Sequence, residues 1–265
     1  GQSIVVTTTS PDTAAAPAAL AQWDEDEGAG AVARNEVSGE RDLELDGVTW
    51  RRGVKGRAFD FDGTAAAWWS DPEGALEFAE RDVTIAMWMH TTKDGVLFAR
   101  CEREGVWVPN GVTFFVRGRK LAFDVGWVGV VTGETVVSDG RWHHVAATWR
   151  ASDGHVTLYV DGLPDGEGHL PLKGTLPSGV ARFGYCSENF PGDPRFSGYL
   201  DGLRLYDRVL DAEAIGAVAA TSGEPFVRAW AIRGDLGDAH WSIESEGIVA
   251  LAMPAAPRRL RANLV

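Results

Sequence analysis

A predicted β-hairpin between Asp139 and Gly162 constrains the fold of this chain more than any other stretch. The segment reads DGRWHHVAATWRASDGHVTLYVDG, in which Asp-Gly pairs mark both ends and Ala-Ser-Asp-Gly supplies the turn. Its second half alternates with a period of two, which is typical of a strand. Its first half, from Trp142 to Trp149, is apolar on both faces. We therefore expect this first strand to lie inside a sheet that is covered on both sides.

The hairpin resembles the central hairpin of LamG-like (laminin-G and pentraxin-like) jelly-roll domains, which belong to the concanavalin A-like sandwiches. Further motifs extend the resemblance over about residues 20 to 217: WDEDEGAG from Trp23, GRAFDFDG from Gly56, VTIAMWMH from Val83 and FSGYLDGLRLYDRVLDAEAI from Phe196. The resemblance implies an all-β fold, a two-sheet antiparallel jelly-roll sandwich with one short helix near 211–220. Asp211 is the expected N-cap of that helix. Glu25 departs from the family pattern, which has an aromatic residue at its place.

The sequence divides the chain into three parts. Residues 1–17 are rich in Thr, Ala and Pro and predict a linker or a loose N-terminal strand, and residues 18–220 form the sandwich. Residues 221–265 have no counterpart in the family pattern. Two strands are predicted there, at 241–244 and 247–253. This segment is either a C-terminal β extension of the sandwich or the start of a further domain.

Composition limits the classes of partner. The formal net charge is −13, which argues against nucleic acid and anionic membranes because both attract basic surfaces. Hydrophobic residues make up 45% of the chain, enough for a substantial core, and no run reaches the roughly 18 apolar residues that span a bilayer. The resemblance implies that this chain is one module of a larger multidomain protein. That protein would be secreted, to the extracellular or periplasmic space.

The resemblance also implies a calcium ion, which in LamG-like domains often ties the N-terminal loop to the sheet. The matching positions are Asn35, Asp42 and Asp201. Calcium requires six to eight oxygen ligands, and Asn35 stands where the family more often has Asp, so the site has one charge fewer. The ion would be structural. The alternative is that these loop residues hydrogen-bond backbone groups.

Catalysis has one sequence signal. Residues 40–44 fit E-x-D-x-E, the signature of laminarinase-type glycoside hydrolases, in which alternate strand residues share one face. The run lies in the N-terminal loop region, and no aromatic residue follows it, so a hydrolase is the least favoured interpretation. His143 and His144 are adjacent in a predicted strand and face opposite ways. We expect them to be hydrogen-bonded structural residues that cannot share a metal.

Two predicted loops, at 102–111 and 187–195, offer aromatic side chains beside amides and charges. An aromatic ring can cover the C–H face of a sugar while polar neighbours bond its hydroxyls. The candidate ligand-binding residues are Trp107, Asn110, Asn189, Phe190 and Arg195, together with Trp127 between two glycines. The alternative is that these aromatic residues pack beneath the loops as satellite clusters.

The interpretation that follows is a non-catalytic carbohydrate-binding or adhesion module, with a polysaccharide, a glycoconjugate or a protein as its partner. A structural or protein-interaction domain without a glycan ligand is the second class, and a glycoside hydrolase the third. Cys101 and Cys186 follow two predicted strands whose ends the family topology could bring together. They form either a disulfide or two separate buried thiols, and the sequence leaves both open.

Overall fold

The computed structural model describes residues 16–70, 76–102, 106–172, 174 and 179–222, and five short strands outside those ranges. The chain forms two compact units, residues 15–224 and a unit made of residues 1–14 and 225–265. In the second unit β20 (Val249–Ala252) pairs with β19 (Ser242–Ile243) and with β1 (Ser3–Val5), and β18 (Trp230–Ala231) pairs with β21 (Asn263–Leu264). The strand pair predicted around 241–253 is thus confirmed. Among the described residues no helix is long and apolar enough to span a bilayer.

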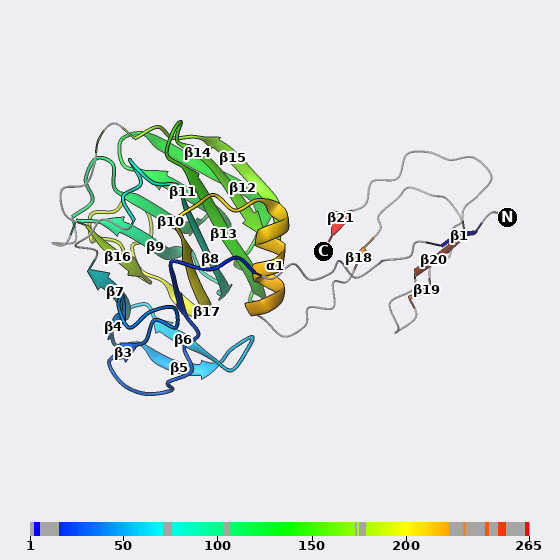
Figure 1. Cartoon of the computed structure of the whole chain (residues 1–265), viewed down its shortest axis with the longest axis horizontal. Coiled ribbons are helices and arrows are strands. Elements are labelled where there is room, and N and C mark those ends of the chain that lie inside the picture. The colour runs from blue at the N-terminus through cyan, green and yellow to red at the C-terminus, as the bar shows by residue number, and fades with distance from the viewer. Residues whose placement is uncertain are drawn as a thin grey trace. The chain divides into compact units, whose positions relative to one another are not determined.

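Two antiparallel sheets make up the described part of the larger unit. Sheet I has the order β12 (Gly129–Val136), β11 (Lys120–Val125), β10 (Val112–Arg117), β9 (Gly95–Cys101), β16 (Val180–Phe183), β7 (Ala66–Ser70), β4 (Leu43–Asp46), β3 (Val32–Ala33). Sheet II has the order β15 (Leu163–His169), β14 (His155–Val160), β13 (Trp142–Arg150), β8 (Val83–His90), β17 (Ser197–Tyr206), β6 (Arg57–Asp62), β5 (Thr49–Arg52), and β2 (Ala21–Trp23) pairs with β17. The sheets pack face to face (Figure 1), which confirms the predicted jelly-roll sandwich.

Alternate residues of both sheets meet in one core. Phe123 of sheet I stacks on Trp149 of sheet II, with ring centroids 6.1 Å apart. The Trp149 indole Nε1 donates to the carbonyl oxygen of Phe78 at 2.7 Å, so the polar atom is paired although the ring is buried. Burying a large side chain of this kind contributes about 1.5–3 kcal/mol relative to leaving it exposed.

The predicted hairpin forms as β13 and β14, with Val145 paired to Val160 and Arg150 to His155. Helix α1 (Ala212–Ser222) lies on the outer face of sheet II (Figure 1), so β13 is covered on both sides as expected. Asp211 Oδ1 accepts a hydrogen bond from the Ala214 N–H at 2.9 Å, which confirms the predicted N-cap.

The same helix covers an outward residue of the hairpin. Alternation along β14 places Tyr159 on the outer face of sheet II, where it is buried in a cluster with Ile215 and Val218 of α1 and with Tyr206 of β17. The helix covers this part of the sheet, and strand alternation alone does not show which face a helix will cover.

The outer face of sheet I has two unlike halves, and this difference positions the candidate site. In the covered half, β9 to β11, outward residues form a buried cluster with loop residues: Val96, Ala99, Cys101, Phe115 and Ala122 with Trp107, Cys186 and Phe190. In the open half, β4, β7 and β16, the outward residues Glu44 and Asp46 are exposed and Trp68 is half-buried, whereas Val180 and Arg182 of β16 are buried.

Candidate functional site

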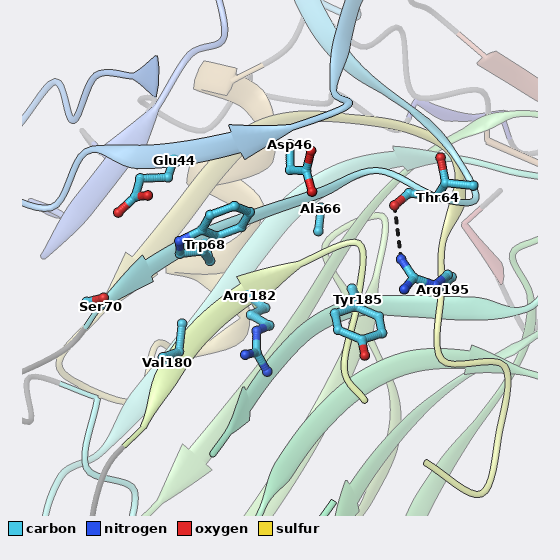
Figure 2. Close-up of a pocket in the computed structure, with 10 residues that line it drawn as sticks. All are labelled: Glu44, Asp46, Thr64, Ala66, Trp68, Ser70, Val180, Arg182, Tyr185 and Arg195. Atoms are coloured by element: carbon cyan, nitrogen blue, oxygen red, sulfur yellow. Dashed lines mark hydrogen bonds between the residues drawn. The ribbon is translucent and has the colours of Figure 1, made fainter. Parts of the chain in front are cut away.

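A pocket of about 350 Å³ lies on the open half of sheet I. Its walls come from β4, β7, β16 and the segment that follows β16 (Figure 2). The side chains that bring polar or aromatic chemistry to it are Glu44, Asp46, Trp68, Arg182, Tyr185 and Arg195.

Backbone register aligns three of these side chains in one row. Trp68 of β7 pairs with Glu44 of β4 on one side and with Arg182 of β16 on the other. The sequence neighbours of Trp68, Ala67 and Trp69, belong to the core, so alternation turns Trp68 outward, where it is half-buried. Residues directly opposite each other on one face lie about 5 Å apart. A carboxylate, an indole and a guanidinium therefore stand side by side across three strands.

Two guanidinium groups hold Tyr185 at the other wall of the pocket. The guanidinium carbon of Arg195 lies 4.2 Å from the Tyr185 ring centroid and that of Arg182 lies 5.7 Å from it. Arg195 Nη1 also donates to the carbonyl oxygen of Thr64 at 2.9 Å, and its Nη2 donates to Oε1 of Glu188 at 2.7 Å. Arg195 is thus fixed in place, and Glu188 balances its charge.

Glu44 and Asp46 form an acidic wall opposite. They occupy alternate positions of β4, so they share a face, and both are exposed. Within the described part of the chain neither carboxylate has a hydrogen bond or an ion pair. Both remain able to accept hydrogen bonds from a ligand. Next to the Trp68 ring, this arrangement suits a polyhydroxylated molecule with C–H groups on its face and hydroxyls at its edge.

Trp107 and Phe190, which the sequence suggested as stacking groups, are buried. Trp107 is 6% exposed and Phe190 is 5% exposed, and their rings meet edge to face with centroids 5.1 Å apart. Phe190 makes a second such contact with Phe115 of β10. The prediction that they are exposed is wrong, because their loops fold onto the covered half of sheet I. The satellite-cluster alternative is confirmed for these two residues.

The other four predicted ligand-binding residues fall in two places. Asn189 joins the two loops, since its Oδ1 accepts from the Trp107 N–H at 2.7 Å and its Nδ2 donates to the Trp107 carbonyl at 3.3 Å. The Asn110 N–H donates to a carbonyl in the β11–β12 turn at 3.1 Å, which brings the first loop beside Trp127. Arg195 lies in the pocket. Residues 103–105 of the first loop lie outside the described residues. Ligand binding by these four residues stays a prediction.

Trp127 has an unusual conformation. It is 68% exposed, and its φ of +60° lies in the left-handed region that favours glycine. The Val128 N–H donates to the Val125 carbonyl at 2.9 Å, which closes a tight turn around it. The turn therefore presents a large aromatic ring to solvent at some cost in backbone strain.

The three predicted calcium ligands do not form one oxygen cluster. Asn35 Oδ1 accepts from two backbone N–H groups at 3.0 and 3.2 Å, and Asp42 Oδ1 accepts from the Asn35 N–H at 2.9 Å. Asp201 Oδ2 accepts from two other backbone N–H groups, at 2.6 and 3.1 Å. No contact between described residues joins Asp201 to the other two, and no group of three or more His, Cys, Asp or Glu residues among them could hold a metal. The residues do not fit the ion in this arrangement, and calcium binding stays a prediction.

Asp201 pairs instead with Glu25, a residue that the sequence singled out only as a departure from the family pattern. Glu25 is 1% exposed, and its Oε2 accepts from the Gly202 N–H at 2.7 Å. Burial and then the charge of Asp201 raise the pKa of Glu25 well above its usual range, and burial raises the pKa of Asp201 to about 6. This buried carboxyl pair fastens the N-terminal segment to β17.

The E-x-D-x-E run does not share one strand. Only Glu44 lies in β4 and lines the pocket, whereas Asp42 precedes the strand and accepts from the Asn35 N–H. The carbonyl oxygen of Glu40 accepts from the Asn35 side chain at 2.7 Å, in the turn before the strand. The three acidic residues therefore do not point into one cleft as the laminarinase signature requires.

His143 and His144 occupy different surroundings, as expected for adjacent strand residues. His143 Nδ1 lies 2.9 Å from Asp161 Oδ2; burial lowers the pKa of this histidine, but hydrogen bonds and charge from Asp161 and Asp139 outweigh burial and raise it. His144 is fully buried, and burial lowers its pKa to about 3. Within the described residues neither ring nitrogen of His144 has a hydrogen-bond partner, so the expectation of a satisfied histidine is wrong there.

Sequence analysis missed most of the pocket. Trp68 lies in the run Ala-Ala-Trp-Trp-Ser, where alternation with the core residue Trp69 marks one of the two rings as outward. Glu44 and Asp46 alternate with two leucines in the same way. These signals identify outward positions, but many outward residues bind nothing, and only the register between β4, β7 and β16 brings these ones together.

Relatives of known sequence match part of the chain. Pentraxin-related protein PTX3 of Mus musculus is 31% identical over 120 residues, which cover 42% of this chain and 32% of that protein. Neuronal pentraxin-2 of Homo sapiens is 36% identical over 92 residues, which cover 32% of this chain and 21% of that protein. The chain thus spans about a third or less of the length of these curated relatives.

Solved structures show the same fold at low identity. Domain 4 of the arabinanase AbnA from Geobacillus stearothermophilus, solved in complex with arabinotriose, matches with a TM-score of 0.58 and 16% identity over 76% of this chain and 98% of that domain. Trypanosoma rangeli sialidase matches with a TM-score of 0.58 and 19% identity over 83% of this chain and 36% of that protein. The family model for the Concanavalin A-like lectin/glucanases superfamily matches residues 62–216, more than half of the chain. The chain belongs to this superfamily.

Proposed function

We propose that this chain is a non-catalytic carbohydrate-binding module and that the pocket on the open half of sheet I holds the glycan. The observation that carries the proposal is the row of Glu44, Trp68 and Arg182, in which a half-buried indole lies between a free acceptor and a charged donor. A sugar ring can lie on the indole while its hydroxyls bond to the groups on either side. Tyr185 and Arg195 extend the surface at the far wall.

The charge of the pocket favours an uncharged glycan. Two carboxylates, Glu44 and Asp46, oppose two guanidinium groups, and Glu188 already balances Arg195. A strongly anionic polysaccharide would meet the acidic wall and a chain with net charge −13. We therefore propose a neutral polysaccharide or glycoconjugate as the partner, and neither nucleic acid nor an anionic membrane.

The comparisons with solved structures and relatives support this assignment. Two structural neighbours were solved with a sugar bound: an arabinanase domain with arabinotriose and a sialidase with a difluorosialic acid. The pentraxin relatives are much longer than the matched region. We propose that this chain is likewise one module of a larger secreted protein that acts outside the cytoplasm, in the extracellular or periplasmic space.

A glycan array on the isolated chain, followed by calorimetric titration of the strongest ligand, tests the proposal. The expected result is that the parent chain binds neutral glycans and that Trp68→Ala weakens this binding. Uronic-acid and sulfated glycans should bind little to either protein. The absence of binding to any glycan by the folded chain would contradict it. Preference for polyanionic glycans would contradict the charge argument and leave the pocket assignment standing.

A glycoside hydrolase is a second candidate, because Glu44 and Asp46 are two free carboxylates on one face of a sugar-sized pocket. Two carboxyl groups that flank a glycosidic bond are the usual machinery of glycoside hydrolysis. Release of reducing ends from laminarin or an array-selected glycan, lost in Glu44→Gln, would favour this candidate over the binding module. No release under conditions of saturated binding would exclude it for that glycan.

A protein-interaction domain is a third candidate, favoured by an aromatic row on the other sheet. Tyr199, His90 and Trp142 pair in register across β17, β8 and β13, all half-buried, and the His90 and Tyr199 rings stack with centroids 5.1 Å apart. The Arg51 guanidinium lies 4.8 Å from the Tyr199 ring centroid. A protein captured in a pull-down by the parent chain but not by Trp142→Ala, with no glycan bound on the array, would favour this candidate over the binding module.

A further inference from the structure

Cys101 and Cys186 meet in the structure although 85 positions separate them in the sequence. Cys101 is the last residue of β9, and Cys186 follows β16, the strand that pairs with β9. The Cys101 thiol donates to the carbonyl oxygen of Cys186 at 3.6 Å, and the two thiols also hydrogen-bond to each other. Both are fully buried and neither forms a disulfide. The thiols are thus adjacent but unlinked, which matches neither sequence alternative in full.

Arg182 connects this thiol pair to the pocket. Its Nη1 donates to Cys101 Sγ at 2.8 Å and to the carbonyl oxygens of Glu102 and Cys186, each at 3.2 Å. The same side chain lines the pocket and stands in the row with Trp68. One side chain therefore contacts the sulfur of Cys101 and lines the proposed ligand site.

The two sulfur atoms have different neighbours, since Arg182 Nη1 lies 2.8 Å from Cys101 Sγ, whereas Cys186 Sγ lies beside the hydroxyls of Thr113 and Ser187. The hydrogen bond from Cys186, together with the charges of Arg182 and Arg100, outweighs burial and lowers the pKa of Cys101 to about 7. The hydrogen bond to Cys101 and burial raise the pKa of Cys186. A thiolate is the nucleophile in thiol–disulfide exchange. Cys101 therefore has the properties of the attacking residue, and Cys186 those of the resolving residue.

We propose that Cys101 and Cys186 are a site of oxidative modification, at which a disulfide oxidant cross-links β9 to the segment after β16 and changes how Arg182 lines the pocket. The Cys101 thiolate attacks a disulfide RS–SR, forms a mixed disulfide and releases one thiolate RS⁻. Cys186 then loses its proton, attacks the Cys101 sulfur and releases the second RS⁻. Two protein thiols are oxidised, RS–SR is reduced to two RSH, and the two protons pass to the released thiolates. Since both sulfurs are buried, the exchange takes place in a locally opened or folding chain.

The cross-link alters the charge that Arg182 faces. In the reduced protein Cys101 Sγ accepts from Nη1 and carries a negative charge whenever the thiol is deprotonated, whereas a disulfide sulfur carries no charge and accepts weakly. Arg182 then directs more of its charge and donor capacity to the pocket. This step rests on the proposed function, and it gives the oxidised protein a higher affinity for the glycan. The expected gain is about threefold to tenfold, the size of one hydrogen bond.

The test uses the full chain, first reduced with dithiothreitol and then refolded in glutathione disulfide. Thiols are counted in denaturant, and intact mass and melting temperature are measured for both forms. The expected result is two titratable thiols in the reduced chain and none in the oxidised monomer, a mass lower by two hydrogen atoms, and a higher melting temperature because the cross-link closes a long loop. Two free thiols after refolding in glutathione disulfide, or only disulfide-linked dimers, would overturn the proposal.

Matched variants separate the steps. Cys101→Ser and Cys186→Ser should each lose the melting-temperature gain on oxidation and end as a single glutathione adduct or a free thiol. Arg182→Gln should shift the pH midpoint of mixed-disulfide formation above that of the unmodified chain, and an unchanged midpoint would overturn the role of Arg182. Equal glycan affinity of the oxidised and reduced forms would overturn the coupling to the pocket. If neither form binds a glycan, the proposed function fails, and the thiol count still decides the cross-link.

Discussion

The covered half and the open half of sheet I belong to one face of one sheet, yet they bury their side chains differently. In the covered half, Trp107 and Phe190 of two loops close over β9 to β11 and leave 6% and 5% of their own surface exposed. In the open half Tyr185, which follows β16, stays half-buried at the pocket wall, and Trp68 remains half-buried on its strand. The loop aromatic residues became core, and a strand aromatic residue became the surface of a pocket.

This difference teaches that an aromatic side chain's role depends on what lies above it. A tryptophan in a polar loop between Gly and Pro-Asn-Gly has the local sequence of an exposed binding residue, but an apolar strand surface beneath it offers a larger gain from burial. A tryptophan in a strand has the local sequence of a core residue, but only one face of that strand meets the core.

Replacing Trp107 should have the largest effect. Trp107→Ala removes a buried ring that contacts Phe190, so it should lower the free energy of unfolding by about 3–5 kcal/mol. Urea denaturation measures the loss. The matched control is Trp127→Ala on the neighbouring turn, where the ring is 68% exposed and a change within about 0.5 kcal/mol is expected. Equal stabilities of the two variants would show that the covered half is not packed as described.

Replacing Trp68 should affect glycan binding and leave stability nearly unchanged, the reverse of what is expected for Trp107. Trp68→Ala should weaken glycan binding by about 2 kcal/mol, roughly thirtyfold, and change the melting temperature little. Trp69→Ala, one residue along the same strand, removes a core ring instead. It should lower the melting temperature while the folded fraction binds with unchanged affinity. Titration calorimetry beside thermal denaturation distinguishes the two, and normal binding by Trp68→Ala would disprove the pocket assignment.

Asp124 lies on the covered half and gives that half a pH dependence. Burial outweighs the charge of Arg117 and raises the pKa of Asp124 to about 6, against about 3.9 in an unfolded chain. The folded chain therefore binds more protons between about pH 4 and pH 6, so its stability falls as pH rises through this window. Asp124→Asn should remove that loss and raise stability by about 1 kcal/mol near pH 7, after allowance for solvent screening, with little change below about pH 4. A variant as stable as the parent chain at both pH values would contradict the burial of this carboxyl.

Replacing Trp127 should change both the free energy of unfolding and the glycan affinity only slightly. In Trp127→Gly the left-handed φ of +60° suits the new residue, but glycine also loses more freedom on folding, so the unfolding free energy should stay within about 0.5 kcal/mol. Affinity for the glycan should fall by about threefold or less, as for a contact at the rim. A thirtyfold fall in the presence of an intact Trp68 would place the binding site at the loops rather than in the pocket.

Calcium should have the smallest effect. Asn35, Asp42 and Asp201 already accept backbone hydrogen bonds, so an ion would gain only the difference between its own bonds and those it replaces. Because the three residues do not form one oxygen cluster, added calcium and excess chelator are each expected to change the melting temperature little; a clear rise with calcium would show that the residues rearrange around the ion, since a ligand of the native state stabilises by mass action. An unchanged melting curve, with no metal in elemental analysis, would rule out this ion.

Local patterns in the sequence were enough to predict the fold class and the hairpin of β13 and β14. Alternation and Asp-Gly turns located β13 and β14, and ordered motifs identified the jelly-roll family, because strand period and turn chemistry are local properties. The N-cap at Asp211 was equally accessible, since a cap bonds a backbone group only three residues away. The same locality explains why His143 and His144 could be assigned to different surroundings.

Long-range contacts, which local patterns do not reveal, fix which outward surfaces stay open. Whether Trp107 binds or packs depends on β10, Phe190 and a loop some 80 residues away, and the row of Glu44, Trp68 and Arg182 depends on the order of strands in sheet I. The pairing of Glu25 with Asp201 and the meeting of Cys101 with Cys186 are contacts of the same long-range kind. Periodicity states which face of a strand a residue occupies, but burial of that face depends on segments distant in the chain.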